Sequence, residues 1–273
     1  MLVNKKIEII IKLLSPFSHF GDENMGTMQI LRTMKFYVND SFLDIPVFSG
    51  NALRGILRRH IMKDFILSLD LNDEGISSKL YYLLFCGGSL EQGGRFSDIG
   101  KKREFRKLCP PISLFGTACY TDMLEGKIKV GISLPICKEL VSYTKLESQI
   151  SIYDMLQEVF YTRLDDLKSK IGRDEIEKNE NPTQMKYEMQ CLSAGTELQT
   201  KIQCVMLNEI EISCLSRTIK LLKENPFIGG KSGSGHGHAY INDNFCKENT
   251  DNLYMKFLKE NKKEILKFIK NLI

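Results

Sequence analysis

The sequence lacks tryptophan, contains only seven prolines among 273 residues, and has no apolar run that approaches eighteen residues. No transmembrane helix and no membrane partner are therefore predicted. The N-terminal segment MLVNKKIEIIIKLL has no small-residue cleavage site and is interrupted by Lys12, so it predicts a β-strand rather than a signal peptide. We expect a cytoplasmic protein, and the hydrophobic fraction of 42% suffices for one elaborated domain with a proper core.

Metal-ligand spacing is also missing. No two of the eight cysteines stand at C-x-x-C spacing, and no cysteine–histidine cluster has zinc-finger spacing. We therefore expect reduced, mostly buried thiols, no metal site and no cofactor, although distant cysteines could still meet in the fold to hold zinc. A large charge of one sign is missing too, because 38 Lys and Arg face 34 Asp and Glu. Local clusters must therefore carry any argument about nucleic acid.

Apolar periodicity predicts six elements of a common core. In chain order they are strand 6–14, helix 50–68, strands 127–134 and 198–206, helix 209–224, and strand 238–241. This order predicts an α+β protein with the ferredoxin-like (RRM-like) fold, whose sheet is a platform in many RNA-binding modules. The other expected segments are a loop-like region over 15–45 with a short strand near 36–38, a charged helical insertion over 146–188, and a lysine-rich amphipathic C-terminal helix over 253–273.

The strongest local signal is a glycine-rich segment between the second predicted helix and the last strand. This glycine loop consists of Gly229, Gly230, Lys231, Ser232, Gly233, Ser234, Gly235, His236 and Gly237. Glycine permits positive φ and lets an anion approach the backbone amides closely, so these glycines are expected to serve phosphate binding rather than packing. The alternative is a merely flexible connection. A nucleotide-binding P-loop is excluded, because Asn225 stands where its first glycine is required and the segment follows a helix.

The second signal is the entry into the first predicted helix, IPVFSGNALRGILRR over residues 45–59. Ser49 or Asn51 can cap this helix, and its N-terminal amides favour an anion. Arg54 and Arg58 lie one turn apart, and Arg59 lies on a neighbouring face. Gly55 costs the helix up to about 1 kcal/mol relative to alanine, so we expect something to pack closely there. The alternative is an ordinary solvated face. A second basic cluster contains Lys101, Lys102 and Arg103.

Residues 45–58 and the glycine loop together resemble the RAMP superfamily of CRISPR proteins. Members of that superfamily carry an iP-x-S-G-x-x-L-R-G-x-L-R segment and a glycine-rich loop in the same order and context. Within it the chain is most similar to the backbone subunit that binds CRISPR RNA. The segments LFCGG (84–88) and PISLFG (111–116) resemble the type IV backbone subunit in particular. The resemblance spans most of residues 6–242.

This resemblance implies a palm formed by residues 1–139 and 199–245, a thumb-like insertion at 140–198, and a C-terminal amphipathic helix at 246–273. The implied partners are the guide RNA, the target nucleic acid paired to it, further copies of the chain in a row along the guide, and other effector subunits. Met185, Lys186 and Tyr187 would form the thumb tip, with apolar wedges that press into the guide–target duplex. The implied contacts to guide phosphates are Ser49, Asn51, Arg54, Arg58, Arg59, Lys101, Lys102, Arg103 and the glycine loop from Gly229 to His236.

The role implied is a scaffold without catalytic residues. The alternative is a metal-independent endoribonuclease of the same superfamily, acting on CRISPR RNA or target RNA, for which a positioned histidine or carboxylate is needed. His19 and Asp22 are the candidates, with His236 as a second histidine and with Asp40 and Asp44 as further aspartates by position. The segment SHFGDENMGT departs from the aspartate loop of the RNA-cleaving members, which puts that activity in doubt. A third interpretation is an unrelated RNA-binding module.

Overall fold

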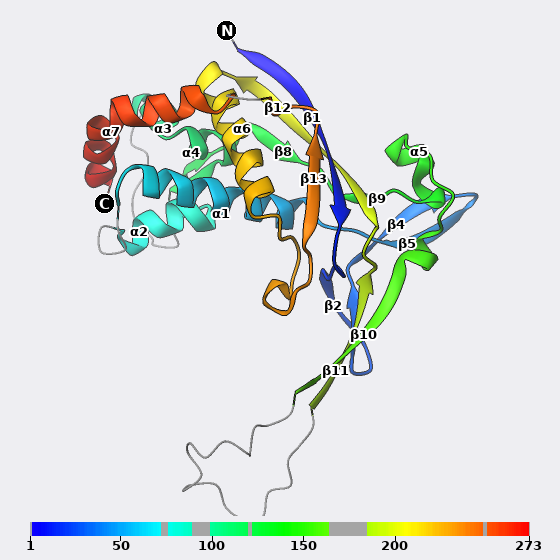
Figure 1. The fold of residues 1–273 in the computed structure, drawn as a ribbon. Helices are drawn as coiled ribbons and strands as arrows, with labels where there is room; N and C mark the ends of the chain where they lie inside the picture. The colour runs from blue at the N-terminus through cyan, green and yellow to red at the C-terminus, as the bar shows by residue number, and fades with distance from the viewer. Residues whose placement is uncertain are drawn as a thin grey trace, which may run out of the picture.

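The computed structural model describes residues 2–71, 76–88, 99–119, 122–163, 185–247 and 250–272. A central sheet runs through the molecule (Figure 1). Its strands are β1 (Val3–Leu13), β8 (Ile128–Val130), β9 (Leu134–Pro135), β12 (Glu197–Leu207) and β13 (Ala239–Asp243). The order is β13-β1-β12-β8, with β9 also paired to β12, and the neighbouring pairs are antiparallel. Two helices connect these strands, so the predicted ferredoxin-like α+β fold is confirmed.

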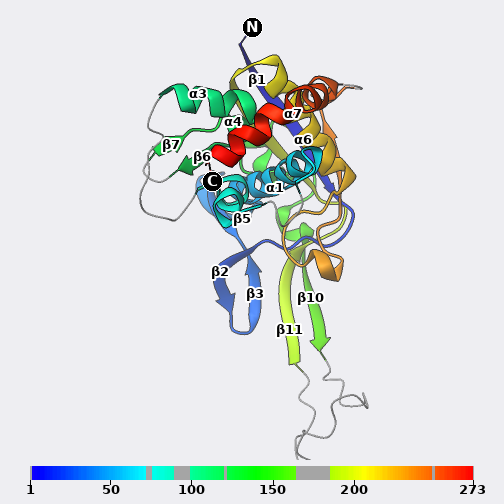
Figure 2. The ribbon, with the colours of Figure 1, turned by 90° about the vertical axis from the view of Figure 1, so that its left-hand side faces the viewer.

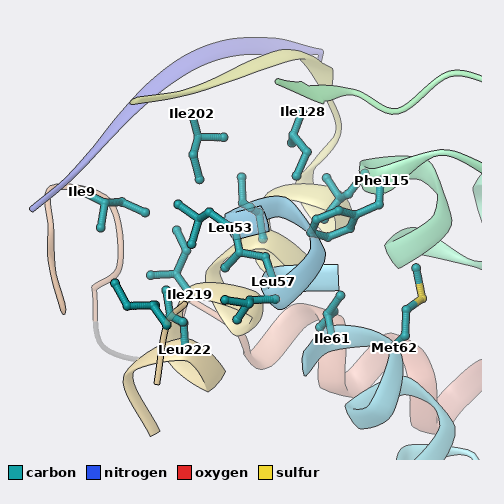
Figure 3. Packing of buried hydrophobic residues seen from close by; sticks show 14 of the residues in the cluster. Ile9, Leu53, Leu57, Ile61, Met62, Phe115, Ile128, Ile202, Ile219 and Leu222 are labelled. Atoms are coloured by element: carbon teal, nitrogen blue, oxygen red, sulfur yellow. The ribbon is translucent and has the colours of Figure 1, made fainter. Parts of the chain in front are cut away.

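The core lies between this sheet and the helices α1 (Gly50–Ser68) and α6 (Glu209–Glu224). Alternate residues of β1, including Ile9, point toward the helices and are buried, as strand geometry requires. Leu53, Leu57 and Ile61 lie on one face of α1, where they are buried in the same core (Figure 3). Full burial of each such side chain contributes about 1.5 to 3 kcal/mol. The observed bounds of α1 and α6 are the predicted ones, because the capping residues and the spacing of the apolar residues indicate the same helices.

A second layer of helices covers α1 and α6 on the side away from the sheet. Figure 2 shows α7 (Asn252–Leu272) lying across the molecule with α3 (Ile99–Leu108) and α4 (Pro110–Phe115) nearby. The predicted C-terminal helix is confirmed, and its apolar face is buried through Tyr254, Leu258 and Ile265. No helix in the described part of the chain is both long and apolar enough to cross a membrane.

A buried ion pair fixes α4 against α6. Glu211 is 1% exposed and accepts a hydrogen bond from Lys127 Nζ at 2.7 Å and another from Ser113 Oγ at 2.6 Å. Its side chain also closes a capping box with Asn208 at the start of α6. Because α4 ends at Phe115, this network also sets the position of the Phe115 carbonyl, which accepts a hydrogen bond from Arg54.

The short strand expected near 36–38 is confirmed as part of a longer strand, but the expectation that the rest of residues 15–45 is loop-like is wrong. They form β2 (Phe20–Met25), β3 (Met28–Leu31), β4 (Thr33–Val38) and β5 (Ser41–Pro46). The β4–β5 turn places Asn39 and Asp40 at φ of 48° and 61°, the left-handed conformations that tight hairpin turns use. These strands are short and rich in polar residues, so their alternation was not visible in the sequence.

The helical prediction for 146–188 is also wrong where the structure describes it. β10 (Leu156–Arg163) pairs antiparallel with β11 (Met185–Leu192), and β3 adds in parallel to β11. The resulting sheet, in the order β10-β11-β3-β2, projects from the main body (Figure 1). Lys186 and Tyr187 lie in β11 rather than in a helix. The part of the expected helical insertion at 164–184 lies outside the described residues.

Three short segments complete the region before the projecting sheet: η3 (Lys138–Leu140), α5 (Val141–Thr144) and η4 (Ile152–Met155). The other short elements are α2 (Ser78–Tyr81), the π-helix η2 (Tyr82–Cys86), and the hairpin of β6 (Thr117–Cys119) and β7 (Asp122–Leu124). The glycine loop between α6 and β13 contains a single 3₁₀ turn, η6 (Ser232–Ser234).

Candidate nucleic-acid interface

A cleft of about 880 Å³ opens along the N-terminal half of α1, and we call it the α1 cleft. It brings together both segments that the sequence singled out. From the first come Asn51, Arg54, Gly55, Arg58 and Arg59, and from the second come Gly229 and Gly230. The other walls are the start of β2, the end of the π-helix η2, and the β6–β7 hairpin. The lining includes three arginines and one acidic residue, Glu125, so the cleft is net positive.

The first turn of α1 is built by its cap and by a close approach to the sheet. Ser49 Oγ accepts a hydrogen bond from the Ala52 amide at 3.3 Å, as the sequence indicated for the cap. A Cβ on Gly50 would lie 2.4 Å from the Val130 carbonyl oxygen, so only glycine lets the helix begin this near β8. Asn51 and Ala52 line the cleft, so the positive end of the helix dipole lies at its wall.

The three arginines of α1 differ in accessibility. Arg54 is partly buried, donates from Nη2 to the Phe115 carbonyl, and has a pKa lowered by burial. Arg58 is 6% exposed and donates from Nε to Leu84 O and, at 2.9 Å, from Nη2 to Leu83 O. Burial, followed by the charge of Arg54, lowers the pKa of Arg58 to about 10, so it stays protonated at neutral pH. Only Arg59 is exposed.

Arg58 therefore has an internal role that the sequence did not indicate, namely to tie α1 to the π-helix η2. A direct phosphate contact by this side chain stays a prediction.

Gly55 has open space above its Cα. A Cβ built on it would meet only Arg59 Nη1, at 3.4 Å, so the close packing expected at this position is not provided by the described part of the chain itself. Gly55 lies instead on the wall of the cleft. A glycine in the middle of a helix lowers its stability, and here no intrachain contact accounts for it. The open surface gives a ligand close access to the helix.

The glycine loop combines packed and unpacked glycines. A Cβ on Gly229 would lie 2.4 Å from Ser18 O, and one on Gly237 would lie 1.8 Å from Ile228 O, both at positive φ. The expectation that these glycines serve little packing purpose is wrong for these two. Gly230 would make only ordinary contacts with Ser18, and Gly233 would meet nothing within 4 Å. The fold therefore requires glycine at positions 229 and 237, at the base of the loop, but not at positions 230 and 233.

The tip of the glycine loop faces the projecting sheet. Lys231 adopts φ of 58°, and the residues from Lys231 to Gly235 are exposed. Lys231 Nζ lies 6.0 Å from the centroid of the Tyr187 ring. Lys231 and Ser234 line a second cavity of about 380 Å³ together with Tyr161 and Tyr187. The predicted loop residues are thus divided between the α1 cleft and a smaller cavity beside β10 and β11.

His236 finds its partners inside the protein. Its side chain is 1% exposed, Nε2 is hydrogen-bonded to Tyr161 Oη, and Nδ1 lies 3.8 Å from Cys191 Sγ. Burial, followed by the charge of Lys231, lowers the pKa of His236. The imidazole therefore anchors the glycine loop to β10 and β11, a role that no local sequence pattern predicts. Contact between this side chain and RNA stays a prediction.

The candidates for catalysis are not gathered at one point. His19 lines the α1 cleft, where its Nε2 lies 3.1 Å from Ser49 Oγ, and its pKa is lowered by burial and then by Arg32. Asp22 has a fully exposed side chain on β2 and is not part of the cleft lining. Asp40 and Asp44 lie on the β4–β5 hairpin. Of these candidates and His236, only His19 lies on the wall of the cleft.

The second basic cluster lies apart from the cleft. Lys101, Lys102 and Arg103 belong to α3, and none of them lines the cleft. The connection between the two is indirect, since Arg106 Nη2 of α3 donates to the Glu125 carbonyl at 2.8 Å. Among the residues that the structure describes, no three His, Cys, Asp or Glu side chains come together as ligands for a metal.

The lining also contains residues that the sequence did not single out. Phe85, Cys86 and Thr117 form part of the wall opposite α1, and Glu125 and Gly126 follow β7. Phe85 lies in the LFCGG segment, which was noted for a family resemblance and not for its aromatic ring. The segment after β7 carries no pattern that could have identified it.

The fold and the cleft define an α+β protein with a ferredoxin-like core, a projecting four-stranded sheet and a basic cleft between a helix N-terminus and a glycine loop. No family model and no curated protein matches the chain. Among solved structures, the chain is similar to one described as "Type IV-B CRISPR Complex", with a TM-score of 0.63 and 20% sequence identity over 88% of this chain and 90% of that chain. At this identity the likeness establishes the fold.

Proposed function

We propose that the chain is a subunit of a CRISPR effector complex and that it binds the guide RNA as a backbone subunit, with the RNA phosphates in the α1 cleft. The single observation that carries the proposal is Gly55, a mid-helix glycine that no contact within the described residues explains, on the wall of a net-positive cleft. The likeness to a chain of a type IV-B CRISPR complex supports the same assignment.

The cleft offers two kinds of group that can bind a phosphate, namely arginine side chains and the N-terminus of a helix. Arg59 is exposed and Arg54 is half-buried, so together they supply a mobile and a fixed cation. The first turn of α1 supplies the helix dipole. Gly230, whose own amide is bonded to Ser18 O, contributes a surface without a side chain rather than a donor. A sugar–phosphate backbone can therefore lie close to the main chain on both sides of the cleft.

The same proposal assigns residues 1–139 and 199–245 to a palm, 140–198 to a thumb, and 246–273 to a separate helix. In this assignment β10 and β11 form the stem of the thumb, with Met185, Lys186 and Tyr187 on β11 toward its far end. Copies of the chain would lie in a row along the guide and present it to the target strand. The clustering of loop tip, Lys231 and Tyr187 beside β10 and β11 supports an RNA path between palm and thumb.

Cleavage of RNA by this chain is the weaker candidate. Of the histidines proposed for it, His19 lies on the cleft, whereas His236 is buried against Tyr161. Acid–base cleavage would then depend on His19 as the histidine at the RNA. Purification of the protein together with its RNA separates the two functions, because a backbone subunit protects its guide RNA and a nuclease consumes it.

The test is purification from cells that also express a CRISPR array, followed by a sizing column read at two wavelengths. We expect a large particle that carries RNA of discrete length. A triple variant, Arg54→Ala, Arg59→Ala and Lys231→Ala, should lose most of this RNA. Its control removes the same charge from the exposed face of α7 through Lys259→Ala, Lys263→Ala and Lys267→Ala. An RNA-free monomer, or equal loss of RNA in both variants, would contradict the proposal.

A further inference from the structure

Three aromatic residues stand beside the α1 cleft, and we call them the aromatic rim: Tyr81, Tyr82 and Phe85. Phe85 is half-buried and lines the cleft. Tyr81 and Tyr82 are 49% and 39% exposed. The rings of Tyr81 and Phe85 are stacked, with centroids 5.0 Å apart and an interplanar angle of 26°. Tyr82 meets Tyr81 edge-on at 6.1 Å. Core packing alone does not account for an ordered aromatic group with two exposed rings and a third ring on the wall of the cleft.

The backbone below the rim is a π-helix, η2, which ends at Gly87 with φ of 81°. Segments of this kind are rare and occur frequently at functional sites. Here the segment is fixed from below by the buried Arg58, which donates to the carbonyls of Leu83 and Leu84. Thr117 Oγ1 donates to Leu83 O at 2.8 Å as well. These bonds hold η2 rigidly, so the position of Phe85 on the cleft wall is determined before any ligand binds.

We propose that the aromatic rim is a stacking platform for an unpaired nucleobase of the nucleic acid whose phosphates lie in the α1 cleft. The inference rests on the proposed function, since it requires nucleic acid in that cleft. A nucleotide joins an anion to a flat π-surface, and the cleft likewise joins Arg54 and Arg59 to the ring of Phe85. Stacking on aromatic rings stabilises single-stranded binding with little sequence preference. Arg58 is a positioning residue for this platform.

The test compares two RNA oligomers of equal length and charge, an oligouridylate and its abasic counterpart, by fluorescence anisotropy. The wild-type protein should bind the base-containing oligomer about 5- to 150-fold more tightly, the factor that stacking of one base provides. Phe85→Leu keeps an apolar side chain but removes the π-surface, so it should lower this ratio toward one by weakening the binding of the base-containing oligomer. Tyr240→Leu removes an exposed tyrosine that does not line the cleft, and the ratio should not change.

Equal binding of the two oligomers by the wild-type protein overturns the platform and leaves the phosphate cleft standing. Binding of neither oligomer overturns the proposed function instead. A ratio that Phe85→Leu does not lower also overturns the platform. If Phe85→Leu fails to fold, 2-aminopurine placed in the oligomer gives the answer on the wild-type chain. Its fluorescence should be quenched on binding, and an unquenched signal refutes stacking.

Discussion

The most informative single substitution is Gly55→Ala, because it should change stability and RNA binding in opposite directions. The added methyl group would meet only the flexible end of Arg59, 3.4 Å away, so the folded chain accommodates it by a small movement of that side chain. Replacing glycine within a helix by alanine stabilises it by up to about 1 kcal/mol. For a chain of this size that gain corresponds to a rise of roughly 2 to 4 °C in melting temperature.

RNA affinity should fall although the protein becomes more stable. The methyl group occupies the surface through which a phosphate would approach α1, and losing one hydrogen bond to a charged group costs about 1.5 to 3 kcal/mol. We therefore expect roughly 10- to 150-fold weaker binding by fluorescence anisotropy, alongside the higher melting temperature from circular dichroism. Ser68→Ala, at the far end of α1, is the control that should leave the affinity unchanged. Wild-type affinity in a stabilised Gly55→Ala protein would refute the assignment of RNA to the cleft.

The remaining predictions concern the glycine loop, the arginines and pH. Gly237→Ala should lower the melting temperature by several degrees or prevent folding, because its Cβ would lie 1.8 Å from the Ile228 carbonyl oxygen and its φ is 73°. Gly233→Ala should have the melting temperature of the wild-type protein, because its Cβ would meet nothing within 4 Å. Equal melting temperatures of the two variants would contradict the packing described. Arg59→Ala should weaken RNA binding and reduce the salt slope by about one, whereas Arg58→Ala should destabilise the fold by about 1 to 3 kcal/mol, because it removes the buried hydrogen bonds to Leu83 O and Leu84 O; the reverse pattern would show that Arg58 is the accessible cation. Burial and Arg32 lower the pKa of His19, which favours its neutral form in the free protein, and a phosphate bound nearby would raise that pKa. Affinity should therefore increase as pH falls from 8 to 6, and a slope that persists in His19→Gln would exclude this histidine as its source.

The sequence predicts an element well where local and long-range requirements agree. Both α1 and α6 have a polar cap followed by apolar residues at helical spacing, and both begin and end at the expected residues. The order of strands and helices then fixes the ferredoxin-like sheet, since few topologies accommodate it. The projecting strands β10 and β11 were predicted as helix although their burial alternates, with Met189 and Cys191 buried on one face of β11. Large apolar residues also stand on the exposed face, where Phe160 is 64% exposed, so the sequence itself shows no period of two.

Within the site, the residue types were predicted more successfully than their roles. The Arg54–Gly55 segment and Gly229–Gly230 meet in one cleft, as their chemistry suggested. The burial of Arg58 and His236 depends on partners that come from distant parts of the chain, Leu83 and Tyr161, which no local pattern links to them. The position of Phe85 depends on the π-helix, whose wider turn changes which side chains face the cleft.

The central claim is that RNA lies along α1 and the glycine loop, and ultraviolet crosslinking of the RNA-loaded particle with mass spectrometry tests it most directly. We predict crosslinked nucleotides on peptides from residues 45–59 and 229–235, together with the peptide that contains Phe85. Crosslinks confined to α3 and α7, with none on α1 or the glycine loop, would contradict the account.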